Sequence, residues 1–221
     1  MPANRDIRVE AVTEAVEAKA SDSEAAVIDE HVRRPLIGLT PEQLSEVAVS
    51  VGLPRFAGKQ MARWLYVGRA TSVDEMTDLS KQGRIRLAQA GYVVGREEPL
   101  ASTASRDGTV KYLFRGCGGR DVESVYIPEK DGRATLCVSS QAGCKMHCVF
   151  CMTGRQGFHG NLTAAQIVNQ ILSIPQSRDL TNVVFMGMGE PTDNLDAVLD
   201  TIEILTAPWG LAWSPKRITV S

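Results

Sequence analysis

The sequence predicts an α/β fold built on a parallel sheet, arranged as a barrel or part of a barrel. From residue 134 onward the chain alternates between short strand-like and helix-like segments, and such alternation is typical of parallel sheets covered by helices. The first helical segment also carries start and stop signals, because Thr163 and Gln166 form a capping box and Pro175 follows its end. The expected order is strand 134–140, a cysteine-rich loop, helix 163–174, strand 181–187, helix 194–205 and strand 217–221.

Three short helices with glycine stops are expected before this region. Thr40 suits the N-cap position, Pro41 suits a first helical turn, and Gln43 completes a capping box. The three segments run over 41–52, 59–68 and 81–91, and each of them ends at a glycine. We therefore expect a small helical accessory domain over residues 35–95.

The remaining segments read as a tail and a hairpin. Residues 1–34 are rich in Ala, Glu, Asp and Ser, which favours a disordered tail with a transient helix near residues 9–20. TVKYLFR (109–115) and VESVYIP (122–128) have strand composition, and the turn-rich segment between them predicts a β-hairpin. This hairpin lies within a connecting region, residues 96–133, and the parallel sheet follows over 134–221.

Composition excludes several classes of protein. Of the 221 residues, 43% are hydrophobic and 23% charged, which is ordinary for a soluble globular protein. No apolar run approaches the roughly 20 residues that span a bilayer, and the N-terminus has no signal-peptide core. We expect a cytoplasmic protein without a membrane partner. The net charge of −2 is not that of a generic nucleic-acid binder, although a local basic patch stays open.

The cysteines indicate metal chemistry. The segment CKMHCVFC places Cys144, Cys148 and Cys151 at C-x3-C-x2-C spacing, too tight for a disulfide framework. Three thiolates on one loop can bind three corners of an iron–sulfur cubane and leave the fourth iron open. The alternative is zinc with His147 as fourth ligand. His147 is adjacent to Cys148, however, and zinc ligands usually come as two separated pairs, so the cluster is favoured.

Together with their neighbours, these residues resemble a known family. The cysteine spacing resembles the radical SAM superfamily, whose cofactor is S-adenosylmethionine (SAM). The motifs LCVSSQAGC, GFHGNLTAAQIVNQI and NVVFMGMGEPTDN resemble the RlmN family over about residues 36–221. The resemblance implies a radical SAM β/α barrel with only its first strands present, preceded by the β-hairpin and the accessory domain. It also implies a [4Fe-4S] cluster on the three cysteines and SAM at the open iron.

The resemblance assigns further roles. Gly187, Gly189 and Glu190 match the SAM-binding turn of the superfamily. Glycines let the backbone approach the cofactor closely, and a carboxylate can accept hydrogen bonds from the ammonium group of SAM. Ser221 matches another polar SAM contact.

Two residues match the chemistry of the RlmN family itself. Glu123 matches its proton acceptor, and Cys137 matches a thiol that forms a transient disulfide with a methyl-carrying cysteine. Without the resemblance, Glu123 would be a solvated strand residue and Cys137 a small buried one. No role is expected for Cys117, His31, His147 or His159.

The family methylates C2 of adenosine in 23S ribosomal RNA and in tRNA, with an electron donor such as a flavodoxin. Two alternatives remain. One is a Cfr-type enzyme that methylates C8, although Cfr-type proteins carry Ala where this chain has Pro191. The other is an iron–sulfur RNA-binding module without catalysis. No cysteine follows Cys151, so we expect a C-terminally truncated family member that is inactive alone.

RNA contacts are expected from the accessory domain. Basic residues there fall near helical spacing around two aromatic side chains, which suits phosphate contacts and base stacking. An ordinary solvated helix face is the alternative. The residues are Arg55, Lys59, Arg63 and Arg69, with Trp64 and Tyr66.

Overall fold

The computed structural model describes residues 33–221. The predicted transient helix and nearly all of the predicted tail lie outside this range. Arg34, expected at the end of the tail, begins strand β1 (Arg34–Pro35) and pairs with β2 (Tyr92–Val93). Within the described range, no helix is long and apolar enough to cross a bilayer.

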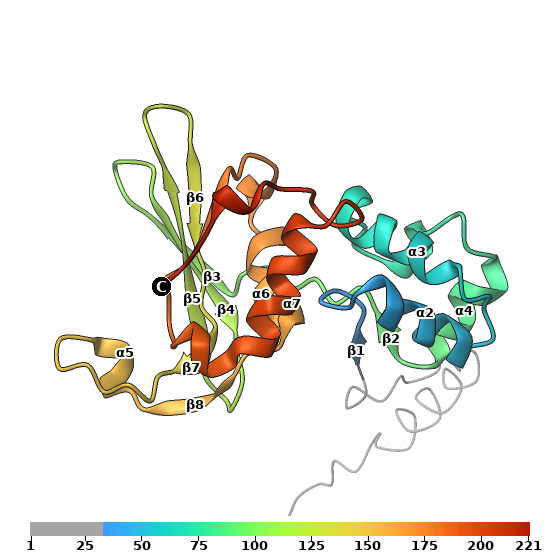
Figure 1. Ribbon diagram of the computed structural model, residues 1–221, viewed down its shortest axis with the longest axis horizontal. Helices are drawn as coiled ribbons and strands as arrows, with labels where there is room; N and C mark the ends of the chain where they lie inside the picture. Colours follow the sequence, from blue (N-terminus) through green and yellow to red (C-terminus); the bar gives the residue numbers. More distant parts are fainter. Residues whose placement is uncertain (1–32) are drawn as a thin grey trace, which may run out of the picture. The chain divides into compact units, whose positions relative to one another are not determined.

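The largest sheet of the described residues has six strands in the order β10-β9-β6-β5-β4-β3 (Figure 1). Strands β6, β9 and β10 are parallel to one another, whereas β3 to β6 are paired antiparallel. The predicted hairpin is present as β4 and β5, and it extends the parallel strands into a mixed sheet. The bounds are β3 Ala101–Ala104, β4 Val110–Arg115, β5 Asp121–Pro128, β6 Ala134–Cys137, β9 Asn182–Phe185 and β10 Ile218–Val220.

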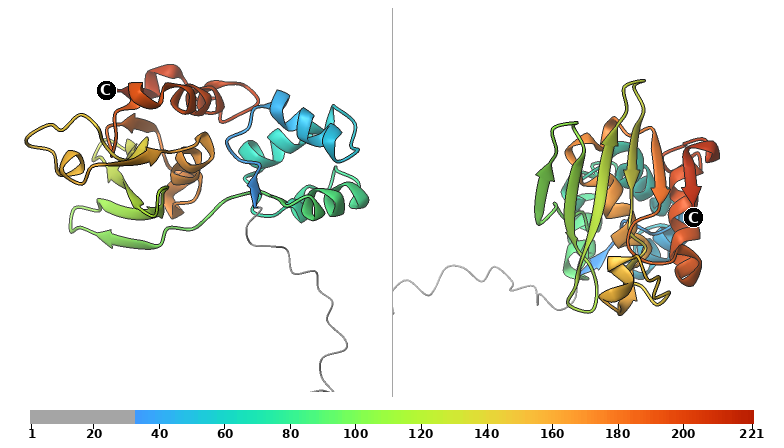
Figure 2. Two further views of the ribbon diagram at one scale, coloured as in Figure 1. Left: turned by 90° about the horizontal axis from the view of Figure 1, so that it is seen from below. Right: turned by 90° about the vertical axis from the view of Figure 1, so that its left-hand side faces the viewer.

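Helices cover one face of this sheet. Both α6 (Ala164–Leu172) and α7 (Leu195–Thr206) lie on the same side, and their apolar side chains bury those of the parallel strands. The capping box of Thr163 and Gln166 opens α6 as predicted. Seen from the other side, the described strands are not covered by helices (Figure 2, right). Leu136, Val183 and Phe185 point into the core, so the alternate residues of these strands face the uncovered side.

The accessory region contains the three predicted helices. They are α2 (Pro41–Ser50), α3 (Ala57–Ala62), which continues as a π-helix over Arg63–Gly68, and α4 (Lys81–Gln89). A 3-10 turn at Val73–Glu75 precedes α4. The capping box at Thr40 and Gln43 is present. The helices share a core that also includes residues of α6 and α7, so the accessory helices pack directly against the sheet layer.

The segment after β6 differs from the prediction. The strand ends at Cys137 rather than at residue 140. A two-stranded ribbon of β7 (Gln141–Gly143) and β8 (Phe158–Asn161) then flanks the cysteine loop, which contains the short helix α5 (Met152–Arg155). These elements are short and glycine-rich, without apolar alternation, so their pattern gave no strand or helix signal. Strand β3, with the sequence ASTA, was also missed, because it is short and has no apolar alternation.

Candidate cofactor site at the carboxyl edge of the sheet

The segments predicted to bind cofactors meet at one edge of the sheet. Cys137, Val184 and Thr219 lie side by side on the parallel strands β6, β9 and β10. The chain therefore leaves all three strands at the same edge, into the cysteine loop, the glycine turn and Ser221. Carboxyl edges of parallel strands are where α/β proteins usually bind ligands.

Backbone hydrogen bonds fasten the glycine turn to the segment after β6. Gly187 N donates to Val138 O over 3.1 Å, and the backbone N–H groups of Ser140 and Gln141 both donate to Met188 O, at 2.9 and 3.1 Å. Met188 N donates to the Ser139 hydroxyl over 2.9 Å. The turn is thus held by the same four residues that lead into the cysteine loop.

This close approach explains the glycines. A Cβ at position 187 would lie 2.6 Å from the carbonyl oxygen of Val138. Gly189 has φ of +102°, and a Cβ there would lie 2.6 Å from the Cβ of Gln141. Both contacts are shorter than van der Waals distance, and the positive φ is a conformation that L-residues rarely adopt.

Glu190 is oriented by the chain itself. Its carboxylate oxygen Oε1 accepts hydrogen bonds from Thr192 N (3.1 Å) and Thr192 Oγ1 (2.7 Å), which caps the 3-10 turn Pro191–Asn194. Its backbone N–H donates to Gln141 Oε1 over 2.9 Å. The carboxylate therefore has a fixed place at this edge of the sheet.

The cysteine loop is more exposed than the turn. Cys144 is buried, Cys151 is half-buried and Cys148 is exposed, and the neighbouring side chains of Val149 and Phe150 are 84% and 88% exposed. Met146 N lies 3.4 Å from Cys144 Sγ, a backbone N–H group donating to sulfur. The pKa of Cys151 is held below its ordinary value, chiefly by a hydrogen bond from the backbone of Gly154.

The three cysteine thiols are ligands of the kind that iron–sulfur clusters use. All three are soft ligands on one loop, and N–H donation to sulfur favours the thiolate form. In residues 33–221 no group of three His, Cys, Asp or Glu side chains is already gathered as a metal site. Convergence of the three thiols on one cluster therefore stays a prediction.

Pattern reasoning missed Gln141, which links the loop and the turn. Its side chain is fully buried. Its Oε1 accepts from Glu190 N, and its Nε2 donates to Asn161 Oδ1 (2.8 Å) and Asp193 Oδ2 (3.3 Å). Asp193 also pairs with Lys145 of the cysteine loop at 3.0 Å. A glutamine between two small residues carries no pattern that predicts such a role.

Glu123 and Cys137 lie on the uncovered face of the sheet. Cys137 pairs with Val125, which is two residues from Glu123, so both side chains leave the same face. Glu123 Oε1 forms an ion pair of 2.9 Å with Lys111 Nζ. Burial raises the pKa of the Cys137 thiol above its ordinary value.

Glu123 and residues of both predicted cofactor-binding segments line one cavity of about 370 Å³. Its lining includes Glu123, Gly143 and Thr153 of the cysteine segment, and Met188 of the glycine turn. His159 also lines it, and the ring Nε2 of His159 lies 3.0 Å from Gln156 O. The described structure thus places the predicted proton acceptor beside the predicted cofactor edge.

The cysteine and histidine residues for which no role is expected make ordinary structural contacts where they are described. Cys117 Sγ lies 3.5 Å from Asn161 O, and the His147 ring contacts Lys145 O. His147 also has φ of +49° within the cysteine loop. His31 lies outside the described residues.

Two residues of the expected RNA-binding face do not lie on that face. Tyr66 is buried, its hydroxyl donates to Leu39 O over 2.7 Å, and its ring packs on Trp209, so it cannot stack on a base. Arg69 follows the π-helix in a left-handed conformation and donates to the Ser177 hydroxyl over 2.7 Å. The Arg69 guanidinium therefore lies beside the 3-10 turn that contains Ser177, and not on the helix face of Lys59 and Arg63.

The remaining residues of that face are more exposed. Arg55, Lys59 and Arg63 are exposed in the structure. The indole N–H of Trp64 donates to Asp78 Oδ1 over 2.5 Å. The expected basic face is therefore reduced to three side chains.

Comparison with known proteins finds two matching regions in the chain. Residues 35–93 match the ribosomal RNA large subunit methyltransferase N-terminal domain, and residues 138–221 match the radical SAM superfamily. A solved radical SAM methyltransferase from Sphaerobacter thermophilus is similar with a TM-score of 0.74 and 37% identity. That similarity covers 84% of this chain and 56% of the other.

Curated relatives carry one name. A probable dual-specificity RNA methyltransferase RlmN of Porphyromonas gingivalis is 59% identical over 84% of this chain and 54% of its own length. A dual-specificity RNA methyltransferase RlmN of Syntrophotalea carbinolica is 45% identical over 88% of this chain and 52% of its own length. The chain spans about half the length of these relatives. Both matched regions and these identities make residues 35–221 similar to RlmN proteins of the radical SAM superfamily.

Proposed function

We propose that this chain is part of an enzyme that methylates C2 of adenosine in 23S ribosomal RNA and in tRNA. The observation that carries the proposal is the shared sheet edge. There the three-cysteine loop, the glycine turn and Ser221 meet, with Glu123 facing a cavity lined by the first two. The RlmN relatives support the choice of reaction.

Cys144, Cys148 and Cys151 would hold the [4Fe-4S] cluster, and the turn with Ser221 would hold SAM. When bound, the cluster would supply the one-electron reduction that SAM needs for radical chemistry. The glycines let backbone groups approach the ligand, and the carboxylate of Glu190, fixed by Thr192, can accept hydrogen bonds from an ammonium group.

Glu123 and Cys137 would act on the RNA side of the reaction. Lys111 holds the Glu123 carboxylate through the 2.9 Å ion pair, and this carboxylate would accept the proton that leaves C2. Cys137 is half-buried on the same face, and its thiol would form the transient disulfide that releases the product. The sequence contains no cysteine after Cys151 to carry the methyl group, so these 221 residues alone should not complete the transfer.

The remaining parts of the proposal concern partners. The exposed residues Arg55, Lys59 and Arg63 would contact RNA phosphates. A flavodoxin-type electron donor and a reducing cytoplasmic setting suit a cluster held by thiolates.

Mass mapping of the modified base tests this function. The 221-residue chain and the longest protein that its gene encodes would each be reconstituted anaerobically and given SAM, reductant and RNA. We expect 2-methyladenosine from a protein that includes a later cysteine, and none from the 221 residues alone. An 8-methyladenosine product would indicate the Cfr-type reaction instead. Formation of 2-methyladenosine by the 221-residue chain would contradict the role given to Cys137.

RNA contact needs its own test. Reversing Lys59 and Arg63 to Glu should weaken RNA binding and flatten its salt dependence, since each lost phosphate contact removes about 0.7–0.9 from the slope. Lys130→Glu with Arg106→Glu is the matched control, because both residues are exposed in turns between strands of the sheet. Equal loss in both double variants would show a nonspecific charge effect.

A further inference from the structure

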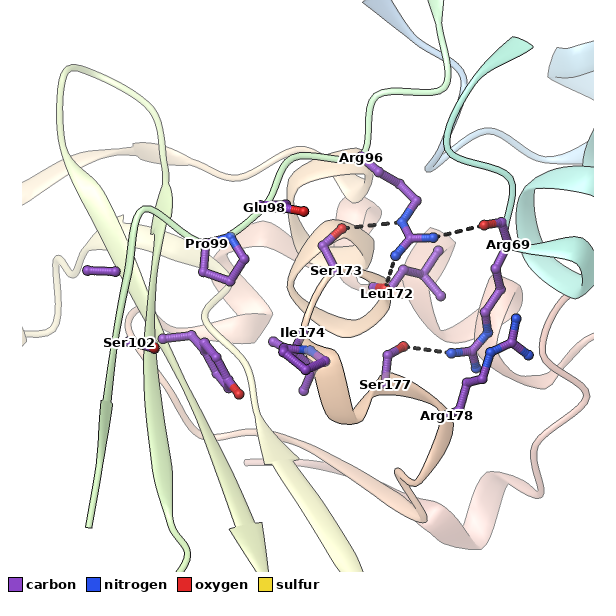
Figure 3. Close-up of a pocket in the computed structure, with 13 residues that line it drawn as sticks. Arg69, Arg96, Glu98, Pro99, Ser102, Leu172, Ser173, Ile174, Ser177 and Arg178 are labelled. Atoms are coloured by element: carbon purple, nitrogen blue, oxygen red, sulfur yellow. Dashed lines mark hydrogen bonds between the residues drawn. The ribbon is translucent and has the colours of Figure 1, made fainter. Parts of the chain in front are cut away.

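A second cavity, of about 520 Å³, is drawn in Figure 3, and no residue of the cysteine loop or the glycine turn lines it. It opens between the start of β3, the end of α6 and the 3-10 turn Pro175–Arg178. Three arginines line it, Arg69, Arg96 and Arg178, and it shares no lining residue with the cavity of Glu123.

Arg96 is fixed by backbone carbonyls. Its Nη1 donates to Arg69 O over 2.9 Å, its Nη2 donates to Leu172 O, and its Nε lies 3.4 Å from the Ser173 hydroxyl. One guanidinium thus joins the accessory region to the end of α6. None of these partners carries a negative charge that would neutralise it.

Arg69 and Arg178 direct their side chains to the same end of the cavity (Figure 3). Arg69 is held by the buried hydroxyl of Ser177, whereas Arg178 is exposed. Burial, together with repulsion from Arg178 and Arg96, lowers the pKa of Arg69. Arginine stays protonated nonetheless, so the repulsion persists.

Acidic side chains balance this charge only in part. Burial and then Arg178 lower the pKa of Arg96, and the negative charge of Glu75 opposes that shift. Among residues 33–221, the cations in ion pairs within 4.0 Å are Lys111, Arg133 and Lys145. Glu98 lines the cavity without an ion pair to any of the three arginines, which leaves an excess of positive charge. Fixed guanidinium groups are suited to oxyanions, because they donate paired N–H groups in one plane.

We propose that this cavity binds a phosphate group, and that its occupant in the working enzyme is a backbone phosphate of the RNA. The second half of this statement rests on the proposed function. Arg96 and Arg69 form the fixed wall of the site, and Arg178 is the solvent-facing group that closes on the anion. The cavity extends the RNA contact from the accessory helices toward the sheet.

The test compares the chain with Arg178→Ala, Arg178→Lys and the control Arg106→Ala. Arg178 and Arg106 are both exposed, so all variants should fold, which circular dichroism checks. Tripolyphosphate is added first, and the thermal midpoint is measured. A site of this kind should raise the midpoint of the parent and of Arg106→Ala by about 3 °C near saturation. The rise should vanish in Arg178→Ala and return in part in Arg178→Lys.

The second measurement is RNA affinity as a function of salt. Arg178→Ala should bind about fivefold more weakly at low salt and lose about 0.7–0.9 from the salt slope, while Arg106→Ala should not. Equal tripolyphosphate effects in all variants, or none in the parent, would overturn the phosphate site. If Arg178→Ala loses the midpoint rise caused by tripolyphosphate but binds RNA as tightly as the unmutated chain, the RNA assignment is overturned. A parent that responds to tripolyphosphate but binds no RNA would contradict the proposed function and leave a site for small phosphates.

Discussion

The glycine turn and the cysteine loop share one sheet edge but are held very differently. The turn is bonded through backbone and side chain to the four residues Val138–Gln141, with the Gln141 side chain fully buried. In the loop, Cys148, Val149 and Phe150 are exposed. Protein contacts therefore fix the turn, whereas few protein contacts fix the middle of the loop.

This difference indicates a division of labour. The turn presents a fixed surface for a ligand that approaches its backbone. The loop supplies thiolates whose final arrangement a cluster can set, as metals commonly do for their ligands. Changes in the turn should therefore affect folding stability, and changes in the loop should affect metal content.

Metal content should show the largest effect. Cys148→Ala removes an exposed side chain, so the fold should persist, but the loss of one of three ligands should reduce iron from about four per chain to near zero. Cys117→Ala is the control, because Cys117 lies outside the cysteine loop. Iron and sulfide analysis after anaerobic reconstitution measures both. Normal loading in Cys148→Ala would refute the ligand assignment.

Stability should respond next, in the turn. Gly189→Ala combines a φ of +102° with a 2.6 Å contact to Gln141, and we expect a loss of about 2–4 kcal/mol in the free energy of unfolding. Gly132→Ala has φ of +86° and open space, so it should lose only about 1 kcal/mol. Urea unfolding at equilibrium checks the pair. Equal losses would mean that the close approach to Gln141 has no energetic weight.

The cysteine loop and the glycine turn also show how much of the structure the sequence could predict. Capping boxes at Thr40 and Thr163 predicted two helices with their starts, since the signal and the structure are both local. The motif GMGEP predicted the turn through resemblance. The role of Gln141 depends on Asn161, Glu190 and Asp193, which are 20 to 52 residues away, and no local pattern encodes such contacts.

Tyr66 and Arg69 show the same limit. Helical spacing placed both on a basic, aromatic face, but spacing does not say which side of a helix the core will cover. The core buried Tyr66, and the π-helix with its left-handed end turned Arg69 toward Ser177. Local pattern is thus more reliable for the type of an element than for its orientation.

Gln141 should couple the two regions. Gln141→Ala removes hydrogen bonds to Glu190, Asn161 and Asp193, and leaving buried polar groups unpaired should cost about 1–3 kcal/mol. Lys145→Ala removes the exposed end of the same network and a cation–π contact with Phe158, with an expected loss within about 1 kcal/mol. Urea unfolding of both variants and of their double variant measures the coupling. Strict additivity would show that Gln141 does not link loop and turn.

Thiol accessibility should give the smallest effect. Iodoacetamide should modify the exposed Cys148 first and Cys137 several times more slowly, because Cys137 is partly buried and burial raises its pKa. A raised pKa leaves less thiolate at neutral pH, so modification of Cys137 should keep increasing as the pH rises through and above the ordinary thiol pKa. Timed labelling with peptide mass spectrometry follows both residues. Equal rates at neutral pH would show that Cys137 is as open as the loop.

The central claim is that the cysteine loop and the glycine turn together bind a cluster and SAM. Electron paramagnetic resonance of the reduced, reconstituted chain, with and without SAM, tests this most directly. We predict a [4Fe-4S]⁺ signal that changes when SAM is added, and a weaker response to SAM in Gly189→Ala at equal cluster content. A cluster signal that SAM leaves unchanged, or stoichiometric zinc without sulfide, would contradict the account.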